Sequence, residues 1–288
     1  GLKTDFIVPI LYRPFDIRYT YYTGKSKGFI CRPRPEFMNH MIKENLALCV
    51  GRAGQVVGIN KPWNLVFCSK YIIDLNIFYR GGSSNFPLYI YQNGHSNQER
   101  IPNFSKEFLE RLQTALGSIP KPKEIFFYIY AILHSPTYRK RYKEFLRVDY
   151  PRIPLTSKPR LFDSLSKLGC ELVLLHTMES PKQYNTVIYL RGEGNNVVET
   201  LRKSSFKNER LKINHNQFFE KINEKVYNYY TGGYQLIKKW LKDRKGNELT
   251  KQEVANLNKL IISISESLVI MDEIDKRIEE LGEGWPIT

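Results

Sequence analysis

Residues 121–133, KPKEIFFYIYAIL, contain the longest apolar run of the sequence, Ile125–Leu133. The run is apolar nearly all round a helical wheel, which is typical of a helix buried in a protein core. Ser135 and Pro136 follow one residue after the run and form a good N-cap and first turn for a second helix, which we predict over residues 137–147. Because the run is about half the roughly 20 apolar residues that a membrane span needs, we expect no membrane segment.

Helical periodicity continues on the C-terminal side of this segment. Leucines at alternating steps of four and three from Leu161 to Leu175 predict a helix with one apolar stripe. Residues 250–253 form a capping box that opens a long helix, and a heptad-like apolar stripe runs from Val254 to Met271. With the helical stretch 234–242, this predicts a helical hairpin within residues 227–288.

Short β-rich runs and glycine-containing turns dominate the N-terminal third. We expect strands over residues 19–22, 46–50, 65–68, 71–74 and 86–91. A further hairpin region is expected at 184–214, with strand-like residues 186–190 and 197–198 on either side of a turn at 192–195.

The predicted fold class is therefore α+β, with a mixed or antiparallel β-rich recognition lobe, packed helices and a helical C-terminal hairpin. The lobe spans residues 1–226 and consists of a β-rich part (1–100), a helical part (105–178) and the hairpin region (184–214). Residues 227–288 form the C-terminal helical segment.

The balance of charge is the most informative bulk property. The 288 residues contain 44 Lys and Arg against 29 Asp and Glu, a formal net charge of +15. Such a surplus attracts polyanions, first of all nucleic acid, although a generally basic proteome or solubility would also explain it. No stretch joins a basic face to a clean apolar one, so an anionic membrane surface is less favoured.

The start of the chain and its cysteines bear on its origin. Residues 1–5 include neither an initiator Met nor a signal peptide, so we expect a piece of a longer protein. The four cysteines are widely spaced and form no C-x-x-C pair, which favours reduced thiols and a cytoplasmic protein.

The sequence imitates several nucleotide and metal sites without completing any of them. Gly24-Lys25-Ser26 ends like a phosphate-binding loop, but Tyr19 stands where that loop needs a glycine. Gly192-Glu193-Gly194 starts a dinucleotide fingerprint, but Val197 replaces the third glycine. The triplet Asp243-Arg244-Lys245 lacks the upstream Pro-Asp partner that a magnesium nuclease needs.

Catalytic groups of other kinds are equally incomplete. Asp149-Tyr150-Pro151 lacks the paired prolines with which an amino-methyltransferase holds an extruded base. The histidines show no metal-ligand spacing and are expected to be structural; they are His40, His95, His134, His176 and His215. We therefore predict a chain without a catalytic centre, metal or cofactor.

Basic and aromatic residues on loops remain as the strongest signal. Residues 12–34 are rich in both and contain Asp16 as their only acid. Arg52 and Gln55 lie on a glycine-rich loop between two predicted strands, and residues 80–85 form a second such loop. Lysine and arginine bind phosphates, whereas arginine, glutamine and asparagine also form bidentate hydrogen bonds with base edges.

These features predict a nucleic-acid groove lined by residues 12–34, 51–63 and 80–86. The candidate contact residues are Arg18, Tyr22, Lys25, Lys27, Arg32, Arg34, Arg52, Gln55, Lys61, Arg80, Ser83 and Asn85. Arg13 and Arg18 could equally pair with Asp16 or Glu36 inside the fold. An RNA-binding module and a protein-interaction scaffold with incidental charge remain open as alternatives.

Several longer motifs follow one another along the chain. They begin with Tyr12-Arg13-Pro14-Phe15-Asp16-Ile17-Arg18 and Thr20-Tyr21-Tyr22, and continue with residues 86–89, 126–136, 138–146, 149–154 and 232–243. In these motifs, which cover most of the chain in order, the sequence resembles the C-terminal specificity region of type ISP restriction-modification enzymes and their single-chain type IIG relatives.

The resemblance implies a function and a partner. Such enzymes join a nuclease, in type ISP also an ATPase, and an adenine-N6 methyltransferase to a C-terminal domain that reads a short asymmetric DNA sequence. On this basis we expect double-stranded DNA and the methyltransferase domain of the same polypeptide as partners, in a bacterial cytoplasm. S-adenosylmethionine, Mg and ATP are expected only in the parent enzyme. The base-reading loops vary in this family, so the resemblance assigns no base contacts.

Overall fold

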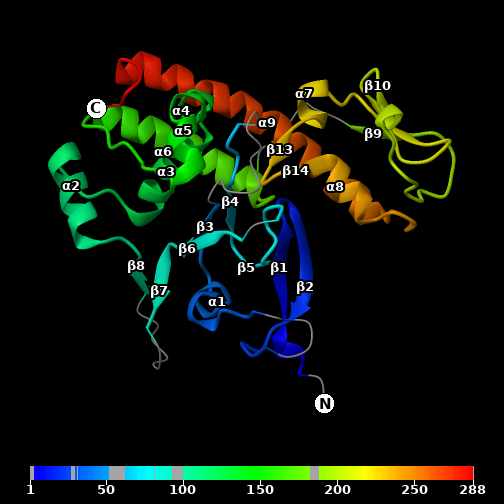
Figure 1. The fold of residues 1–288 in the computed structure, drawn as a ribbon, viewed down its shortest axis with the longest axis horizontal. Coiled ribbons are helices and arrows are strands. Elements are labelled where there is room, and N and C mark those ends of the chain that lie inside the picture. Colours follow the sequence, from blue (N-terminus) through cyan, green and yellow to red (C-terminus); the bar gives the residue numbers. More distant parts are fainter. Residues whose placement is uncertain are drawn as a thin grey trace.

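The computed structural model describes residues 3–26, 30, 32–51, 62–80, 82–92, 100–181 and 188–287. Long helices form one layer, and the β-rich N-terminal part projects from one side of it, with the N-terminus at its far end (Figure 1). A separate small sheet lies beyond the end of the helical layer. The expected α+β class with a helical C-terminal part is confirmed.

Antiparallel pairing organises the N-terminal part. Strand β1 (Ile7–Arg13) forms a hairpin with β2 (Asp16–Tyr21) and pairs in parallel with β5 (Ile72–Ile73). A second sheet has the order β4 (Val66–Ser69), β3 (Ala47–Val50) and β6 (Ser84–Pro87). The remaining elements are the 3-10 helix η1 (Thr4–Phe6), α1 (Pro35–Met41) and the pair β7 (Tyr89–Tyr91) and β8 (Arg100–Pro102).

The strand expected over residues 86–91 is divided in two. β6 pairs with β3, whereas β7 pairs with β8, so the chain changes partner at Leu88. The buried side chain of Asn45 supports the change, since it donates to the carbonyl of Tyr89 (2.7 Å) and accepts from its N–H (3.1 Å). Asn45 thus gives hydrogen-bond partners to the N–H and the carbonyl of Tyr89, which lie beyond the end of the β3–β6 ladder.

The helical layer is built on the segment 121–133, as predicted. Its elements are α2 (Lys106–Leu116), α3 (Pro122–His134), α4 (Pro136–Arg141), α5 (Lys143–Val148), α6 (Pro159–His176), α7 (Glu224–Tyr227), α8 (Leu236–Lys242) and α9 (Lys251–Gly282). Ser135 caps α4 by accepting from the N–H of Tyr138 (2.9 Å). The helix expected over 137–147 is two helices, because the backbone leaves helical geometry at Tyr142 (φ −99°, ψ 19°).

The long C-terminal helix α9 is an internal support of the fold. Its predicted capping box is present, with Thr250 Oγ1 accepting from the N–H of Glu253 and the Glu253 carboxylate accepting from the N–H of Thr250. By length and composition α9 could cross a membrane, but it packs against α3, α4, α6, α7 and α8 and buries Leu257, Ile261 and Ile264 of the predicted stripe. These buried contacts explain its apolar composition.

The region 188–220 pairs differently from the hairpin that we predicted. β9 (Tyr189–Arg191) pairs with β12 (Phe218–Glu220), at the edge of a sheet that continues through β11 (Arg210–Lys212) to β10 (Phe206–Lys207). Val197 and Val198 bridge to residues 248 and 245 instead. Short strands of this kind take their partners from the tertiary fold, so sequence proximity misled the prediction. The remaining elements are η2 (Lys203–Ser205), β13 (Tyr230–Thr231) and β14 (Tyr234–Gln235).

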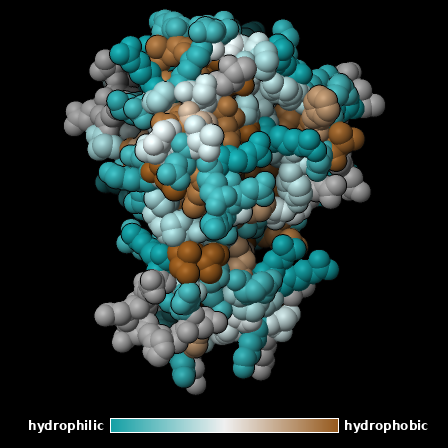
Figure 2. Space-filling view, turned by 90° about the vertical axis from the view of Figure 1, so that its left-hand side faces the viewer, coloured by the Kyte–Doolittle hydropathy of each residue, from teal (hydrophilic) through white to brown (hydrophobic). Residues whose placement is uncertain are grey.

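One hydrophobic core joins both sides of the expected boundary at residue 226. It includes Leu11, Phe67, Tyr130 and Leu161 together with Ile261 of α9. Outside the core, the face that lies on the left of Figure 1 is hydrophilic over much of its area, with hydrophobic patches between (Figure 2). On this face the fold therefore presents a largely polar surface over a shared apolar interior.

Close approach of α3 and α6 leads to a first prediction. A Cβ atom added at Gly169 would lie 1.9 Å from the carbonyl oxygen of Phe127, a backbone atom that cannot move aside easily. Alanine is normally about 1 kcal/mol better than glycine inside a helix. We nevertheless expect Gly169→Ala to lower the free energy of unfolding by about 2 kcal/mol, because overpacking separates the helices.

The measurement is chemical denaturation followed by circular dichroism. Gly282→Ala is the matched control, since its added Cβ approaches side chains and no backbone atom: the end of Leu161 (2.9 Å) and Ile278 Cγ2 (3.7 Å). A Gly169→Ala protein as stable as the unmodified chain would contradict the close packing of α3 on α6.

Two buried histidines lead to a second prediction. Burial, followed by the charge of Arg139, lowers the pKa of His176 to about 3, and the pKa of His134 also lies well below its usual value because of burial. At pH values between the lowered pKa of each buried histidine and its ordinary pKa of about 6.5, the unfolded chain binds more protons than the folded chain. Stability is therefore full above pH ~6.5 and falls as the pH is lowered, by up to about 1.4 kcal/mol per pH unit for each histidine.

Replacing His176 tests this origin of acid sensitivity. The His176→Gln protein should lose less stability than the unmodified chain between pH 7 and pH 5, measured by denaturation at each pH. Exposed His215 serves as the control, and His215→Gln should leave the slope unchanged. Equal slopes for the unmodified chain and His176→Gln would refute the assignment.

Candidate nucleic-acid interface

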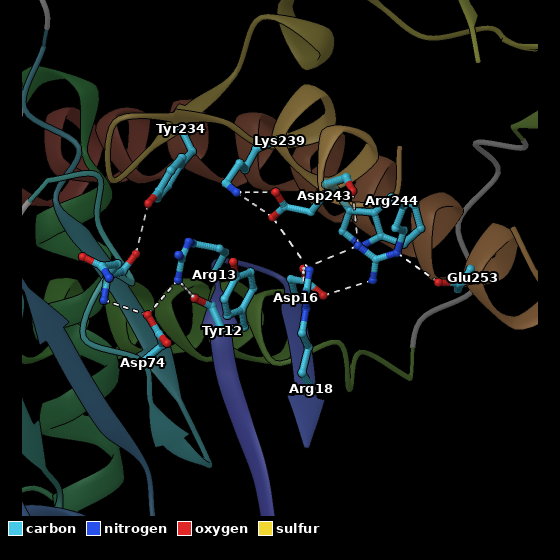
Figure 3. Close-up of polar contacts among 12 residues, drawn as sticks. Tyr12, Arg13, Asp16, Arg18, Asp74, Tyr234, Lys239, Asp243, Arg244 and Glu253 are labelled. Carbon is cyan, nitrogen blue, oxygen red and sulfur yellow. Dashed lines mark hydrogen bonds and ion pairs between the residues drawn. The ribbon is translucent and has the colours of Figure 1, made fainter. Parts of the chain in front are cut away.

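A network of charged side chains attaches the β1–β2 hairpin to the helical layer (Figure 3). The carboxylate of Asp16 is only 4% exposed and accepts from Arg18 Nη2 (2.9 Å) and from Arg244 Nη2 (3.1 Å). Arg244 follows α8 and also binds Glu253, the capping residue of α9, through Nε (3.1 Å). Asp16 is placed by the tight turn of the hairpin, in which Phe15 has a positive φ of 64°.

A second group of contacts lies beside Asp16. Arg13 Nη1 binds Asp74 Oδ1 (2.7 Å), and its guanidinium carbon lies 3.9 Å from the centre of the Tyr12 ring. On α8, Lys239 Nζ binds both carboxylate oxygens of Asp243 (2.5 and 2.6 Å). The motif at residues 12–18 therefore positions the hairpin on α8 and on the segment after β5.

The network changes the interpretation of Arg18. Its guanidinium is 38% exposed but bonds to Asp16 and lies 3.7 Å from Asp243. Burial lowers the pKa of Arg18, but the hydrogen bond and charge of Asp16 outweigh this effect, and the net shift is upward. Of the two alternatives for Arg18, pairing with Asp16 is the one found, whereas Arg13 pairs with Asp74 rather than with Asp16 or Glu36.

Two other candidate residues lie in the interior. Tyr22 is 3% exposed, and its hydroxyl donates to the carbonyl of Pro33 (2.9 Å). Ser83 is 8% exposed, and its hydroxyl donates to Asn85 Oδ1 (2.6 Å). Both side chains are engaged within the fold, which corrects the expectation that they face a nucleic acid. Asn85 belongs to strand β6 and not to an open loop.

The remaining described candidates are exposed cations. Lys25, Arg32, Arg34 and Arg80 all lie on the surface of the N-terminal part. Within the described parts of the chain, none of the four has a carboxylate partner at ion-pair distance. Arg34 and Arg80 occupy positive-φ positions (44° and 54°). These cations are available to an external anion.

Four candidates lie outside the described residues: Lys27, Arg52, Gln55 and Lys61. On either side of the last three, Gly51 and Trp63 are buried in the core, whereas Pro62 is exposed. Gly51 donates to the carbonyl of Leu65 (2.8 Å) and leaves no room for a Cβ beside Leu65 and Phe78. Trp63 is fully buried, and the next residue, Asn64, donates to the carbonyl of Tyr230 (3.1 Å).

The sequence analysis did not predict that Asp74, Lys239 and Arg244 belong to this charged network. Arg244 is separated from Asp16 by 228 positions, so no local spacing connects them. The available signal was Asp16 itself, the only acid in a basic stretch, because a buried carboxylate needs cationic partners. Among the described residues, no group of three or more His, Cys, Asp or Glu side chains is arranged to hold a metal ion.

Fold and surface together define a class: an α+β domain in which carboxylates pair Arg13 and Arg244 within the fold, while exposed cations of the described N-terminal part have no such partner. The family of Type ISP C-terminal specificity domains matches residues 1–273. The chain belongs to this family. Comparison with curated protein sequences gives no match.

Solved structures share the fold. The chain resembles the ATP-dependent Type ISP restriction-modification enzyme LlaBIII bound to DNA (TM-score 0.73, 20% identity, 95% of this chain and 18% of that chain). It also resembles DrdV in a DrdV–DNA complex (TM-score 0.76, 22% identity, 95% and 28%). A third is a nuclease-deletion mutant of the Type ISP enzyme LlaGI with a DNA substrate mimic (TM-score 0.66, 20% identity, 95% and 25%). The chain thus spans less than a third of the length of each.

Loss of the central carboxylate should destabilise the whole fold. Asp16→Asn leaves Arg18 and Arg244 close together without their shared anion, and breaking such a buried pair costs about 3 kcal/mol. We expect the free energy of unfolding to fall by this amount. Glu110→Gln, which removes an exposed pair with Lys106 (3.6 Å), should cost less than about 1 kcal/mol. Equal effects of the two substitutions in denaturation experiments would argue against a central role for Asp16.

Proposed function

We propose that this chain recognises a short sequence in double-stranded DNA, as the specificity part of a bacterial restriction-modification enzyme. The observation that carries the proposal is the set of exposed cations without carboxylate partners on the N-terminal β part: Lys25, Arg32, Arg34 and Arg80. Membership of the specificity-domain family supports it, as does the likeness to LlaBIII and DrdV in their complexes with DNA.

The proposal divides the candidate residues by chemistry. Lys25 and Arg32 would bind phosphates, because exposed flexible cations neutralise the DNA backbone without reading sequence. Arg52 and Gln55 would read base edges, because both form bidentate hydrogen bonds with purines. Lys27, Lys61 and Asn85 remain candidates for backbone contacts. Gly51 and Trp63, which lie on either side of residues 52–61, are held in the core. This supports base reading by Arg52 and Gln55, since such residues need a rigid support.

The rest of the activity would belong to other parts of the same polypeptide. A methyltransferase domain would use S-adenosylmethionine to modify the adenine that this chain selects, and nuclease and ATPase parts would use Mg and ATP. The chain itself would bind no cofactor and act in the bacterial cytoplasm. Residues 1–226 would form the recognition lobe, and residues 227–288 would support it.

Selection from a random pool tests the function directly. The immobilised chain is incubated with random-sequence duplexes and with single-stranded RNA of the same length. We expect repeated rounds to enrich duplexes that share one short asymmetric motif. Preferential retention of the RNA, or a duplex pool that stays random, would contradict sequence recognition in duplex DNA.

Substitutions separate affinity from discrimination. Lys25→Ala with Arg32→Ala should weaken binding to selected and random duplexes alike and should reduce the salt dependence, by about 0.9 in log–log slope for each lost phosphate contact. Arg52→Ala with Gln55→Ala should bring the affinities for selected and random duplexes closer together.

The matched control uses exposed cations of the helical layer, Arg111→Ala with Lys167→Ala, which should bind DNA as the unmodified chain does. Titrations by fluorescence anisotropy at several salt concentrations provide all of these values. Identical losses in the control and in the Lys25 and Arg32 protein would refute a localised interface.

A further inference from the structure

A polar cleft of about 750 Å³ lies between the β9–β12 sheet and the end of α8. Three separate parts of the chain line it: residues 197–200 with 202, 204 and 205, residues 212–215, and residues 245–246. None of the candidate contact residues named from the sequence belongs to it, and Lys245 drew attention only as part of an incomplete nuclease triplet.

Unpaired positive charge distinguishes the cleft. Arg202, Lys212 and Lys245 all line it and are exposed, whereas Glu199 is the single acid in its lining. In the described chain none of the three cations has a carboxylate at ion-pair distance. Cations that share one cleft repel each other, and a bound anion relieves the repulsion.

Backbone hydrogen bonds hold the three walls together. Glu199 donates its N–H to Ile213 (2.7 Å), which joins the first wall to the second. Gly246 donates to Val198 (2.8 Å), and Val198 donates to Asn247 (3.1 Å), which joins the first wall to the third. Because these bonds fix the backbone that carries the three cations, binding requires ordering of side chains but not of the walls.

The cleft also contains neutral hydrogen-bond donors suited to phosphate oxygens. Ser204 and Ser205 contribute hydroxyls beside Arg202. Asn214 also lines the cleft, but its side-chain amide donates to the carbonyl of Val197 (3.1 Å) and to Gln217 Oε1 (2.9 Å) and so supports the wall. Lysine and arginine accompanied by hydroxyl and amide groups are the usual partners of phosphate oxygens in protein–DNA complexes.

The position of the cleft connects it to the proposed interface. Lys245 directly follows Arg244, the residue that binds Asp16 at the start of β2. The cleft and the β1–β2 hairpin therefore meet at the C-terminal end of α8, which lies between the hairpin and the β9–β12 sheet (Figures 1 and 3). An extended polyanion that follows the surface of the hairpin would reach the cleft. The adjacency of hairpin and cleft therefore favours DNA over a small anion as the ligand.

We propose that this cleft binds the phosphate backbone of the DNA outside the bases that are read, through Arg202, Lys212 and Lys245. The inference rests on the proposed function, which it extends with a second contact region on the β9–β12 side of the molecule. Such contacts fix the orientation of the duplex and carry no sequence information.

The test uses the whole chain and a 30-base-pair duplex of random sequence, with a duplex that contains the selected motif as a second probe. Lys212→Ala with Lys245→Ala should weaken binding to both duplexes by the same factor. It should also reduce the log–log salt slope by about 1.8, or about 0.9 for each phosphate. Lys212→Arg with Lys245→Arg, which keeps both charges, should restore affinity and slope. The Arg111 and Lys167 pair is the control for general loss of charge.

The possible results are distinguishable. If the unmodified chain binds duplex DNA and the Lys212 and Lys245 protein keeps its affinity and slope, the cleft does not bind DNA although the proposed function stands. The same conclusion follows if the control pair reduces the slope equally. If the unmodified chain binds no duplex, the proposed function itself is overturned.

Discussion

The carboxylate of Asp16 is the contact on which the arrangement of the molecule depends. It joins Arg18 of its own hairpin to Arg244 at the end of α8, and Arg244 in turn reaches the capping residue of α9. Arg18 also lies 3.7 Å from Asp243, so the ionic contacts between the hairpin and the helical layer gather at the end of α8 (Figure 3). Together with the apolar core that the hairpin shares with the helices, this carboxylate holds the hairpin on the helical layer.

Charge in this protein serves two purposes that burial separates. Arg13 and Arg244, at 12% and 14% exposure, are held by carboxylates within the fold. Exposed cations such as Lys25 and Lys212 have no such partner in the described chain and contribute most to the attraction of polyanions. The net charge alone does not distinguish the two groups; burial and carboxylate partners do.

The sequence predicted the elements better than their partners. The apolar run 121–133 and the capping box of α9 depend on local chemistry, and both were found where expected. The pairing of β9 with β12 and the contact of Asp16 with Arg244 depend on residues far apart in the chain, which local patterns do not encode. Tyr22 was wrongly placed at the interface for a related reason. The local sequence around an aromatic residue in a basic stretch is the same whether its side chain is buried or exposed.

The most direct test of the central claim is lysine acylation, measured by mass spectrometry with and without the selected duplex. It compares the proposed DNA-binding surfaces with the helical layer in one molecule. The account predicts that bound DNA protects Lys25 on the N-terminal part and Lys212 in the cleft, while Lys106 on α2 and Lys167 on α6 react as before. Protection of Lys106 and Lys167 with full reactivity at Lys25 and Lys212 would place the DNA on the helical layer and contradict the account.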